Sequence, residues 1–186
     1  MSLTQRNLVL SILVFSCVAQ AGERSVMRAV VAHEYGDPEV LKVEELPRPE
    51  PNDKQALVRV IANSVNPADP LTLSGKYARE FGTHLPLIPG YDISGIVEKT
   101  GANITKLKVG DAVYGYPTFG GGWAEYVTVS EGEVAAKPRS LSFAQAAAVP
   151  MGALTASQAL VDVAQLHTGQ TILIHGGSGG VGSFAL

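Results

Sequence analysis

The residues best suited to chemistry stand near the end of the chain, where an apolar run meets closely spaced glycines. Residues 171–175 read Thr-Ile-Leu-Ile-His, and residues 176–182 read Gly-Gly-Ser-Gly-Gly-Val-Gly. Glycines permit a tight turn and close approach of the backbone, and the N–H groups at a helix start face phosphate oxygens. A strand, a glycine turn and a helix start in this order predict a site for the pyrophosphate of a dinucleotide.

The side chains that bind zinc are too few and too scattered to predict a metal site. Catalytic zinc takes three convergent ligands from Cys, His, Asp or Glu, and structural zinc commonly takes four cysteines. Cys17 is the only cysteine, and the histidines are His33, His84, His167 and His175. We therefore expect no metal. Without a Lewis acid, reduction of an activated acceptor is a better expectation than alcohol oxidation.

Composition bounds the class of protein and of partner. The 186 residues are 46% hydrophobic and 17% charged, as in an ordinary packed core. This length favours one domain, or one domain plus a fragment. A net charge of -3, a pI near 5.8 and the lack of a basic cluster argue against nucleic acid as a partner. We expect the partner to be a small molecule.

The N-terminus has the pattern of an export signal. Arg6 precedes an apolar stretch at residues 8–19, and the small residues of Ala-Gln-Ala follow at positions 19–21. This order is typical of a signal peptide, here residues 1–21, with a short linker at residues 22–26. The apolar stretch is shorter than the roughly 20 residues that span a bilayer, so we expect no permanent membrane span. The pattern predicts a periplasmic or secreted protein.

Two alternatives to simple cleavage remain open for this segment. The residues that end at Cys17 loosely resemble a lipoprotein cleavage site, in which that cysteine carries the lipid. Alternatively, translation begins at Met27, in which case the first 26 residues are not part of the protein and it is cytoplasmic.

From Met27 onward, short segments rich in Val, Ile and Tyr alternate with turn residues, which predicts strands of a barrel or sandwich. The predicted strands are residues 28–33, 41–44, 56–62, 93–99, 112–116 and 124–129. Gly, Pro, Asn and Asp separate most of them.

Helical patterns begin only after residue 141. Ser142 and Gln145 have the spacing of a capping box, and Pro150 starts a second segment. An apolar stripe follows at helical spacing, with Gly169 as the predicted stop. The stripe consists of Ala156, Leu160, Val163 and Leu166.

Taken in order, six segments resemble the medium-chain dehydrogenases/reductases, and most closely their zinc-independent quinone oxidoreductase, or zeta-crystallin-like, branch. The segments are residues 27–30, 64–69, 87–95, 109–115, 120–126 and the glycine run 176–182. Each is a weak signal alone, and their order makes a strong one. The resemblance covers residues 27–186, about the first half of a typical member, so we expect a chain truncated after the glycine turn.

The resemblance implies a mainly β fold with an α/β start. A GroES-like β-barrel at residues 27–150 would bind substrate. Residues 151–186 would hold an interdomain helix and the first strand and glycine turn of an incomplete Rossmann domain. The cofactor implied is NADPH or NADH, with NADP slightly favoured, and the substrate is a quinone or conjugated enone.

The resemblance also implies residues of the cleft where substrate and nicotinamide meet: Asn66, Tyr77, Tyr91 and Thr155. Asn66 would donate its amide to an acceptor oxygen, or else is only a turn residue. The two tyrosines would donate from the cleft rim, or else are simply half-buried. Thr155 would approach the nicotinamide, or else bonds its own helix backbone. Zinc-dependent relatives carry a Cys near Asn66, and a Gly-His-Glu where this chain has Gly-Tyr-Asp at residues 90–92.

In the glycine run, the family's cofactor contacts match Ser178, Gly179, Gly180 and Val181, with Gly176 and Gly182 at turn and packing positions. The run also contains the dinucleotide-binding register from Gly177 to Gly182, which leaves the exact pairing open. A tyrosine that lines the cofactor in some members is Leu71 here. The ribose-reading residue falls about 20 positions past the glycines, so NAD and NADP are not distinguished.

Together these observations predict an oxidoreductase that transfers hydride to a quinone or enone without zinc, impaired in this truncated chain. The strand at residues 171–175 lacks neighbours, and we expect the chain from about residue 168 to be poorly ordered or to need a partner. The alternative function is a non-catalytic GroES-like module that binds a small ligand or a protein. The full-length protein would form a homodimer.

Overall fold

The computed structural model describes residues 25–76, 78 and 82–186. The predicted signal peptide, with Cys17, and the candidate cleft residue Tyr77 lie outside the described residues. Among the residues described, no helix is long and apolar enough to cross a membrane.

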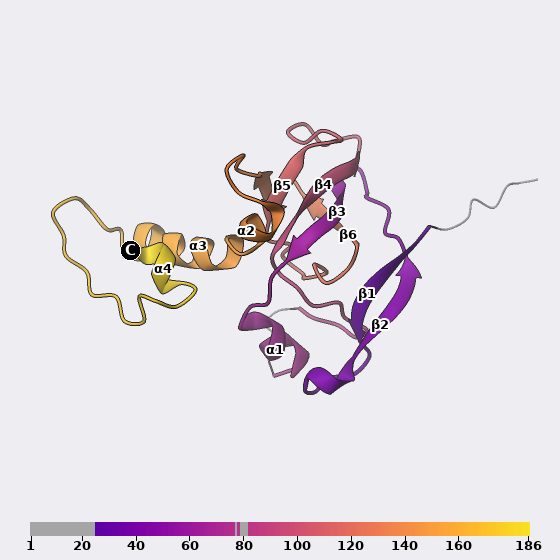
Figure 1. Cartoon of the computed structure of the whole chain (residues 1–186), viewed down its shortest axis with the longest axis horizontal. Coiled ribbons are helices and arrows are strands. Elements are labelled where there is room, and N and C mark those ends of the chain that lie inside the picture. The colour runs from indigo at the N-terminus through magenta and orange to yellow at the C-terminus, as the bar shows by residue number, and fades with distance from the viewer. Residues whose placement is uncertain (1–24, 77, 79–81) are drawn as a thin grey trace, which may run out of the picture.

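Two antiparallel sheets form the body of the molecule (Figure 1). A hairpin pairs β1 (Val26–Ala32) with β2 (Leu41–Pro47), and η1 (Pro38–Val40) lies between them. The second sheet has five strands in the order β6-β3-β4-β5-β7. Their bounds are β3 (Gln55–Asn63), β4 (Ile93–Thr100), β5 (Ala112–Gly115), β6 (Tyr126–Ser130) and β7 (Val134–Ala136). The six predicted strands all form, and β7 is one that the sequence did not predict.

The five-stranded sheet buries one apolar face. Val58, Ile93, Val97 and Val113 are fully buried in one cluster that spans β3, β4 and β5. Burying each such side chain contributes about 1.5–3 kcal/mol. The β1 hairpin joins this body through the isolated bridge between Ala29 and Ala124. The result is the mainly β architecture that the sequence predicted.

A short helix, α1 (Ala68–Leu73), contradicts the prediction that helices begin only after residue 141. The Asn-Pro pair at residues 66–67 indicated a turn, but it starts a helix instead. The Asp69 carboxylate accepts a hydrogen bond from the Asn66 backbone N–H at 2.6 Å, which stabilises the helix start. Proline this early in a helix removes no intrahelical hydrogen bond, so Pro70 is tolerated.

The helices after residue 141 follow the predicted order, and the second of them is extended by a π-helix. Ser142 and Gln145 form the capping box of α2 (Phe143–Ala147), and α3 (Pro150–Ser157) begins at the predicted proline. The chain then continues as a π-helix, η2 (Gln158–Val163). Gln165, with φ at 48°, lies in the left-handed region just past its end, so Gly169 is not the stop. Of the apolar stripe, Ala156 is buried and Val163 is 82% exposed.

The glycine-rich end forms the predicted helix but not the predicted strand. Residues 171–175 have no strand partner in the described chain, and Leu173 is 82% exposed. A single strand has no ladder of hydrogen bonds, because these come from neighbouring strands. The chain makes a wide loop and returns to α4 (Gly182–Ala185) beside α3 (Figure 1). A Cβ on Gly152 would lie 2.9 Å from the carbonyl oxygen of Gly180, so this return is close.

Candidate active site

Two segments that are distant in sequence converge on the buried carboxylate of Asp92. Its Oδ2 accepts hydrogen bonds from Ser64 Oγ at 3.0 Å and Asn66 Nδ2 at 2.9 Å. Its Oδ1 accepts one from the backbone N–H of Met151 at 2.9 Å. Asp92 is 1% exposed. Burial raises the pKa of this carboxyl group, and the hydrogen bonds from Asn66, Ser64 and Met151 oppose that rise.

A second buried carboxylate, Asp69, organises the same loop from the other side. Its two oxygens accept the backbone N–H groups of Asn66, at 2.6 Å, and Gly90, at 2.9 Å. Burial raises the pKa of Asp69, its two backbone hydrogen bonds lower it, and the nearby charge of Asp92 raises it further. Through Gly90, Asp69 holds the segment before Tyr91.

The amide nitrogen of Asn66 is engaged inside the protein. Nδ2 donates to Ser64 Oγ at 3.1 Å and to Asp92 Oδ2 at 2.9 Å. The expected donation of this amide to an acceptor oxygen would therefore compete with two existing hydrogen bonds. The carbonyl oxygen of the amide is the atom left for a ligand, and it can only accept.

Tyr91 is an interior residue, not a rim residue. It is 4% exposed, its hydroxyl lies 2.8 Å from Thr72 Oγ1, and its ring stacks on Tyr116 with centroids 5.6 Å apart. Burial raises the pKa of Tyr91, the hydrogen bond to Thr72 lowers it, and the charge of Asp69 raises it. The phenol stays protonated at neutral pH. Tyr91 and Thr72 also line a cavity of about 550 Å³.

Thr155 bonds the backbone of its own helix, which is one of the two alternatives that the sequence left open. Its hydroxyl donates to the backbone oxygen of Met151, one turn earlier in α3, at 2.7 Å. The side chain lies on an exposed part of the helix. Asn66 and Met151 thus meet at Asp92, whereas the side chains of Tyr91 and Thr155 bond Thr72 and Met151 instead.

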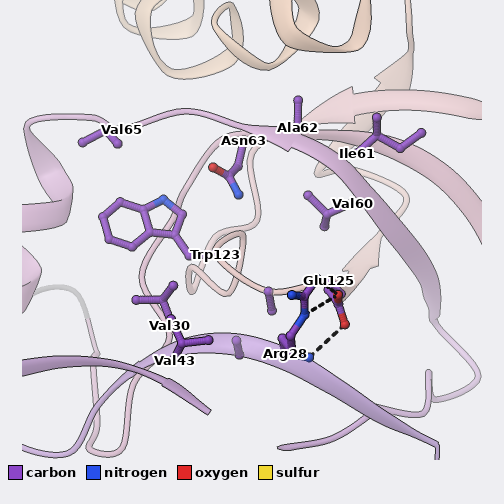
Figure 2. A pocket seen from close by; sticks show the side chains of 12 residues that line it. Arg28, Val30, Val43, Val60, Ile61, Ala62, Asn63, Val65, Trp123 and Glu125 are labelled. Atoms are coloured by element: carbon purple, nitrogen blue, oxygen red, sulfur yellow. Dashed lines mark hydrogen bonds and ion pairs between the residues drawn. The ribbon is translucent and has the colours of Figure 1, made fainter. Parts of the chain in front are cut away.

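A cavity of about 540 Å³ lies beside the site, between β1, β3 and residues 123–125 (Figure 2). Its lining is mostly apolar, with Val30, Val60 and Val65 among the wall residues. The ring of Trp123 stands at one side and the exposed Arg28–Glu125 ion pair at the other. The Trp123 indole donates to the backbone oxygen of Ser64 at 3.2 Å, which connects this wall to the loop that holds Asn66.

The glycine-rich run forms a tight turn, in which its own backbone atoms approach one another closely. A Cβ on Gly182 would lie 2.2 Å from the carbonyl oxygen of Gly176, and Gly176 has a φ of 72°. A Cβ on Gly180, in contrast, would meet nothing within 4 Å. The turn is therefore tight on one side and open on the other.

In the described parts of the chain, no group of three or more His, Cys, Asp or Glu residues could hold a metal ion.

Comparison with known proteins identifies the family that this architecture resembles. Residues 52–139 match the alcohol dehydrogenase GroES-like domain family. The chain is 41% identical over 160 residues to a quinone oxidoreductase from Homo sapiens, over 86% of this chain and 48% of that protein. The chain belongs to the medium-chain dehydrogenase/reductase family, in its quinone oxidoreductase branch.

Two further members extend the comparison. An NADPH-dependent alkenal/one oxidoreductase of Arabidopsis thaliana is 38% identical over 90% of this chain and 45% of that protein. The solved quinone oxidoreductase of Coxiella burnetii matches with a TM-score of 0.78 and 38% identity, over 87% of this chain and 52% of that one. The chain thus spans about half the length of the relatives it matches.

Sequence reasoning missed Asp92 as the centre of this candidate site. The position was present in the segment 90–92, which the resemblance aligns with a Gly-His-Glu of zinc-dependent relatives. Nothing local to Asp92 indicates that Ser64 and Met151 will reach it, because those contacts depend on the folded sheet.

Proposed function

We propose that this chain is part of an NAD(P)H-dependent reductase that transfers hydride to a quinone or conjugated enone, and that the described residues form its substrate side and the glycine-rich turn of its cofactor side. The identity of about 40% with quinone oxidoreductases and with an NADPH-dependent alkenal/one oxidoreductase carries this proposal. Both kinds of acceptor delocalise negative charge in their own π systems. The protein then has to position the acceptor and exclude water.

The proposed reaction needs no zinc. The two places where zinc-dependent members carry Cys and His hold Asn66 and Tyr91, an amide and a phenol that already bond Asp92 and Thr72. Neither is a good zinc ligand in this state. Treatment with a chelator should leave cofactor binding and turnover unchanged, and loss of either on chelation would contradict a zinc-free site.

The glycine-rich turn fits one part of a dinucleotide site. Gly182 permits the tight turn, and the open side at Gly180 leaves room for a phosphate next to the backbone. We propose Ser178, Gly179, Gly180 and Val181 as the pyrophosphate contacts, with Gly176 and Gly182 shaping the turn. When bound, the nicotinamide supplies the hydride. The choice between NADPH and NADH stays part of the proposal, with NADPH favoured.

Within this scheme the loop at residues 64–66 forms the polar wall of the substrate side. The Asn66 carbonyl oxygen can accept a hydrogen bond from a hydroxyl of the reduced product or from an amide of the cofactor. Tyr91 stays within the wall, where it supports Thr72 and the stacked ring of Tyr116. Thr155 would face the cofactor from α3 through its hydroxyl oxygen, since its proton is donated to Met151.

Cofactor binding and turnover test the proposal directly. NADPH is titrated into the protein while the fluorescence of Trp123 is followed, and NADPH oxidation is then measured with 1,4-benzoquinone and with a simple enone. Micromolar binding with acceptor-dependent oxidation supports the reductase. A Gly180→Ala variant is the matched control, because its new methyl group meets no protein atom but enters the proposed phosphate space. Equal NADPH affinity in both proteins would contradict these phosphate contacts.

A second candidate function is a non-catalytic module that binds a small apolar ligand. The open cavity beside Trp123 favours it, because residues from the β-rich body alone line this mostly apolar space of about 540 Å³. Quenching of Trp123 fluorescence by an apolar quinone in the absence of NADPH, with no turnover after NADPH is added, would select this function.

Location and assembly are further parts of the proposal. We propose export through residues 1–21, with residence in the cytoplasm if translation starts at Met27, and a homodimer of the full-length protein. Fractionation of cells that express the tagged protein, and light scattering of the purified protein, test these points.

A further inference from the structure

Asp92 connects the substrate side of the molecule to the helix that leads to the glycine-rich turn. On one side its carboxylate holds Ser64 and Asn66, which follow β3. On the other side it accepts the backbone N–H of Met151 in the first turn of α3. Among the described residues, no other side chain joins these two segments by hydrogen bonds.

The bond to Met151 caps α3 from outside the helix. The residue at the helix N-cap, Val149, has no side chain that could accept a hydrogen bond, so the helix start lacks its own cap. A carboxylate at a helix N-terminus satisfies an unpaired N–H group and interacts favourably with the helix dipole. Asp92 therefore ties the first turn of α3 to the loop that follows β3.

The next residue of α3 carries this connection to the glycine-rich turn. Gly152 follows Met151, and its missing side chain lets the backbone of Gly180 approach until a Cβ would be 2.9 Å from the carbonyl oxygen. The ring of Phe184 in α4 would lie 3.1 Å from the same Cβ. The glycine-rich turn thus contacts α3 at Gly152, one residue after the hydrogen bond from Met151 to Asp92.

We propose that Asp92 is a positioning residue for the hydride transfer, because its carboxylate sets the glycine-rich turn relative to the loop that holds Asn66. This inference rests on the proposed function. A carboxylate suits the position because it accepts all three hydrogen bonds, whereas an amide offers one acceptor atom and brings a competing donor. Misplacement of a bound cofactor by about 1 Å can lower turnover on the order of 100-fold.

The first test measures the connection itself, independent of activity. In Asp92→Asn, amide hydrogens at residues 153–157 of α3 should exchange at least about tenfold faster than in the native protein, while those of Val58 and Val97 keep their order of protection. Asp69→Asn is the matched control, because Asp69 is equally buried but reaches only Asn66 and Gly90. Unchanged protection of α3 in Asp92→Asn, or the same loss in Asp69→Asn, would overturn the inference.

The second test separates positioning from binding. Asp92→Asn should lower kcat for NADPH-dependent quinone reduction about 10–100-fold, with both KM values within about threefold of native. Gly152→Ala, which keeps Asp92 and should fold as a helix, is expected to show the same pattern with α3 fully protected. A rise in KM alone, or an unchanged kcat in Gly152→Ala, would overturn the role of Asp92. Absence of NADPH-dependent reduction in the native protein would instead overturn the proposed function.

Discussion

The β-rich body and the arm, which is the chain after residue 157, both contain apolar runs that predict strands, but only those of the body form them. In the body, the apolar run at β4 pairs with strands on both sides, and Ile93 and Val97 are fully buried. In the arm, the equally apolar run at residues 171–175 forms no strand, and Leu173 is 82% exposed. The comparison teaches that an apolar run specifies a strand only where neighbouring strands supply its hydrogen bonds.

Amide exchange should show the largest contrast between the two regions. In the described arm, no backbone N–H from residue 171 to residue 178 donates to a backbone carbonyl. These amides should exchange at close to the rate of an unfolded chain, and those of Val58 and Val97 at least about 10³-fold more slowly. Exchange measured by NMR on a protein shown to be monomeric checks this. Strong protection at residues 171–175 would remove the contrast.

Truncation of one apolar side chain in each region should give the next largest difference. Ile93→Ala leaves a cavity in the fully buried cluster and should lower the free energy of unfolding by about 2–5 kcal/mol. Leu173→Ala, on an exposed side chain, should change it by less than about 0.5 kcal/mol. Urea unfolding followed by circular dichroism measures both. A loss above 1 kcal/mol in Leu173→Ala, by the same scale, would mean that the arm packs in solution.

Two glycines allow a sharper comparison with the same added methyl group. In Gly95→Ala, the Cβ would lie 2.1 Å from the backbone oxygen of Arg59, so overpacking should cost about 1–3 kcal/mol of stability. In Gly180→Ala, the methyl group meets open space and stability should be nearly unchanged. Thermal unfolding of both variants distinguishes them. Equal losses would show that the glycine-rich turn is as closely packed as the sheet.

The smallest expected effect is a change in the free energy of unfolding with pH, caused by two buried carboxyl groups of the body. Burial raises the pKa of both Asp69 and Asp92, so the folded protein holds protons that the unfolded chain releases near pH 4. Their contribution to stability is present below that pH and is lost as the pH rises through the raised pKa values. The native protein should therefore exceed Asp92→Asn in free energy of unfolding by less and less as the pH rises from about 4 through the raised pKa values. A difference that grows with pH would contradict the direction of the shift.

The body was predictable because its signals are local. Alternating apolar residues and turn residues predicted the strands, and Ser142 with Gln145 predicted the start of α2. The helix α1 was missed because its stabilising contact, from Asp69 back to the Asn66 backbone, resembles an ordinary turn in sequence.

The site was less predictable because its contacts are not local. The predicted residue Asn66 does lie at the polar centre, but its amide is engaged by Asp92, 26 positions away. Tyr91 was expected at a rim, and only the stacked ring of Tyr116 and the hydroxyl of Thr72 reveal why it is buried. The roles of the glycine-rich turn remain predictions, since their residues meet few groups in the described chain.

The strand order of the larger sheet has a consequence for how this protein behaves at high concentration. Both edges are short, with five residues in β6 and three in β7, so they present few free backbone groups to another molecule. The uncharged run at residues 171–174 presents many, and it has the composition of an aggregation-prone segment. Insoluble material should therefore originate in the arm. A Leu173→Pro substitution would then raise the soluble yield without weakening the sheet.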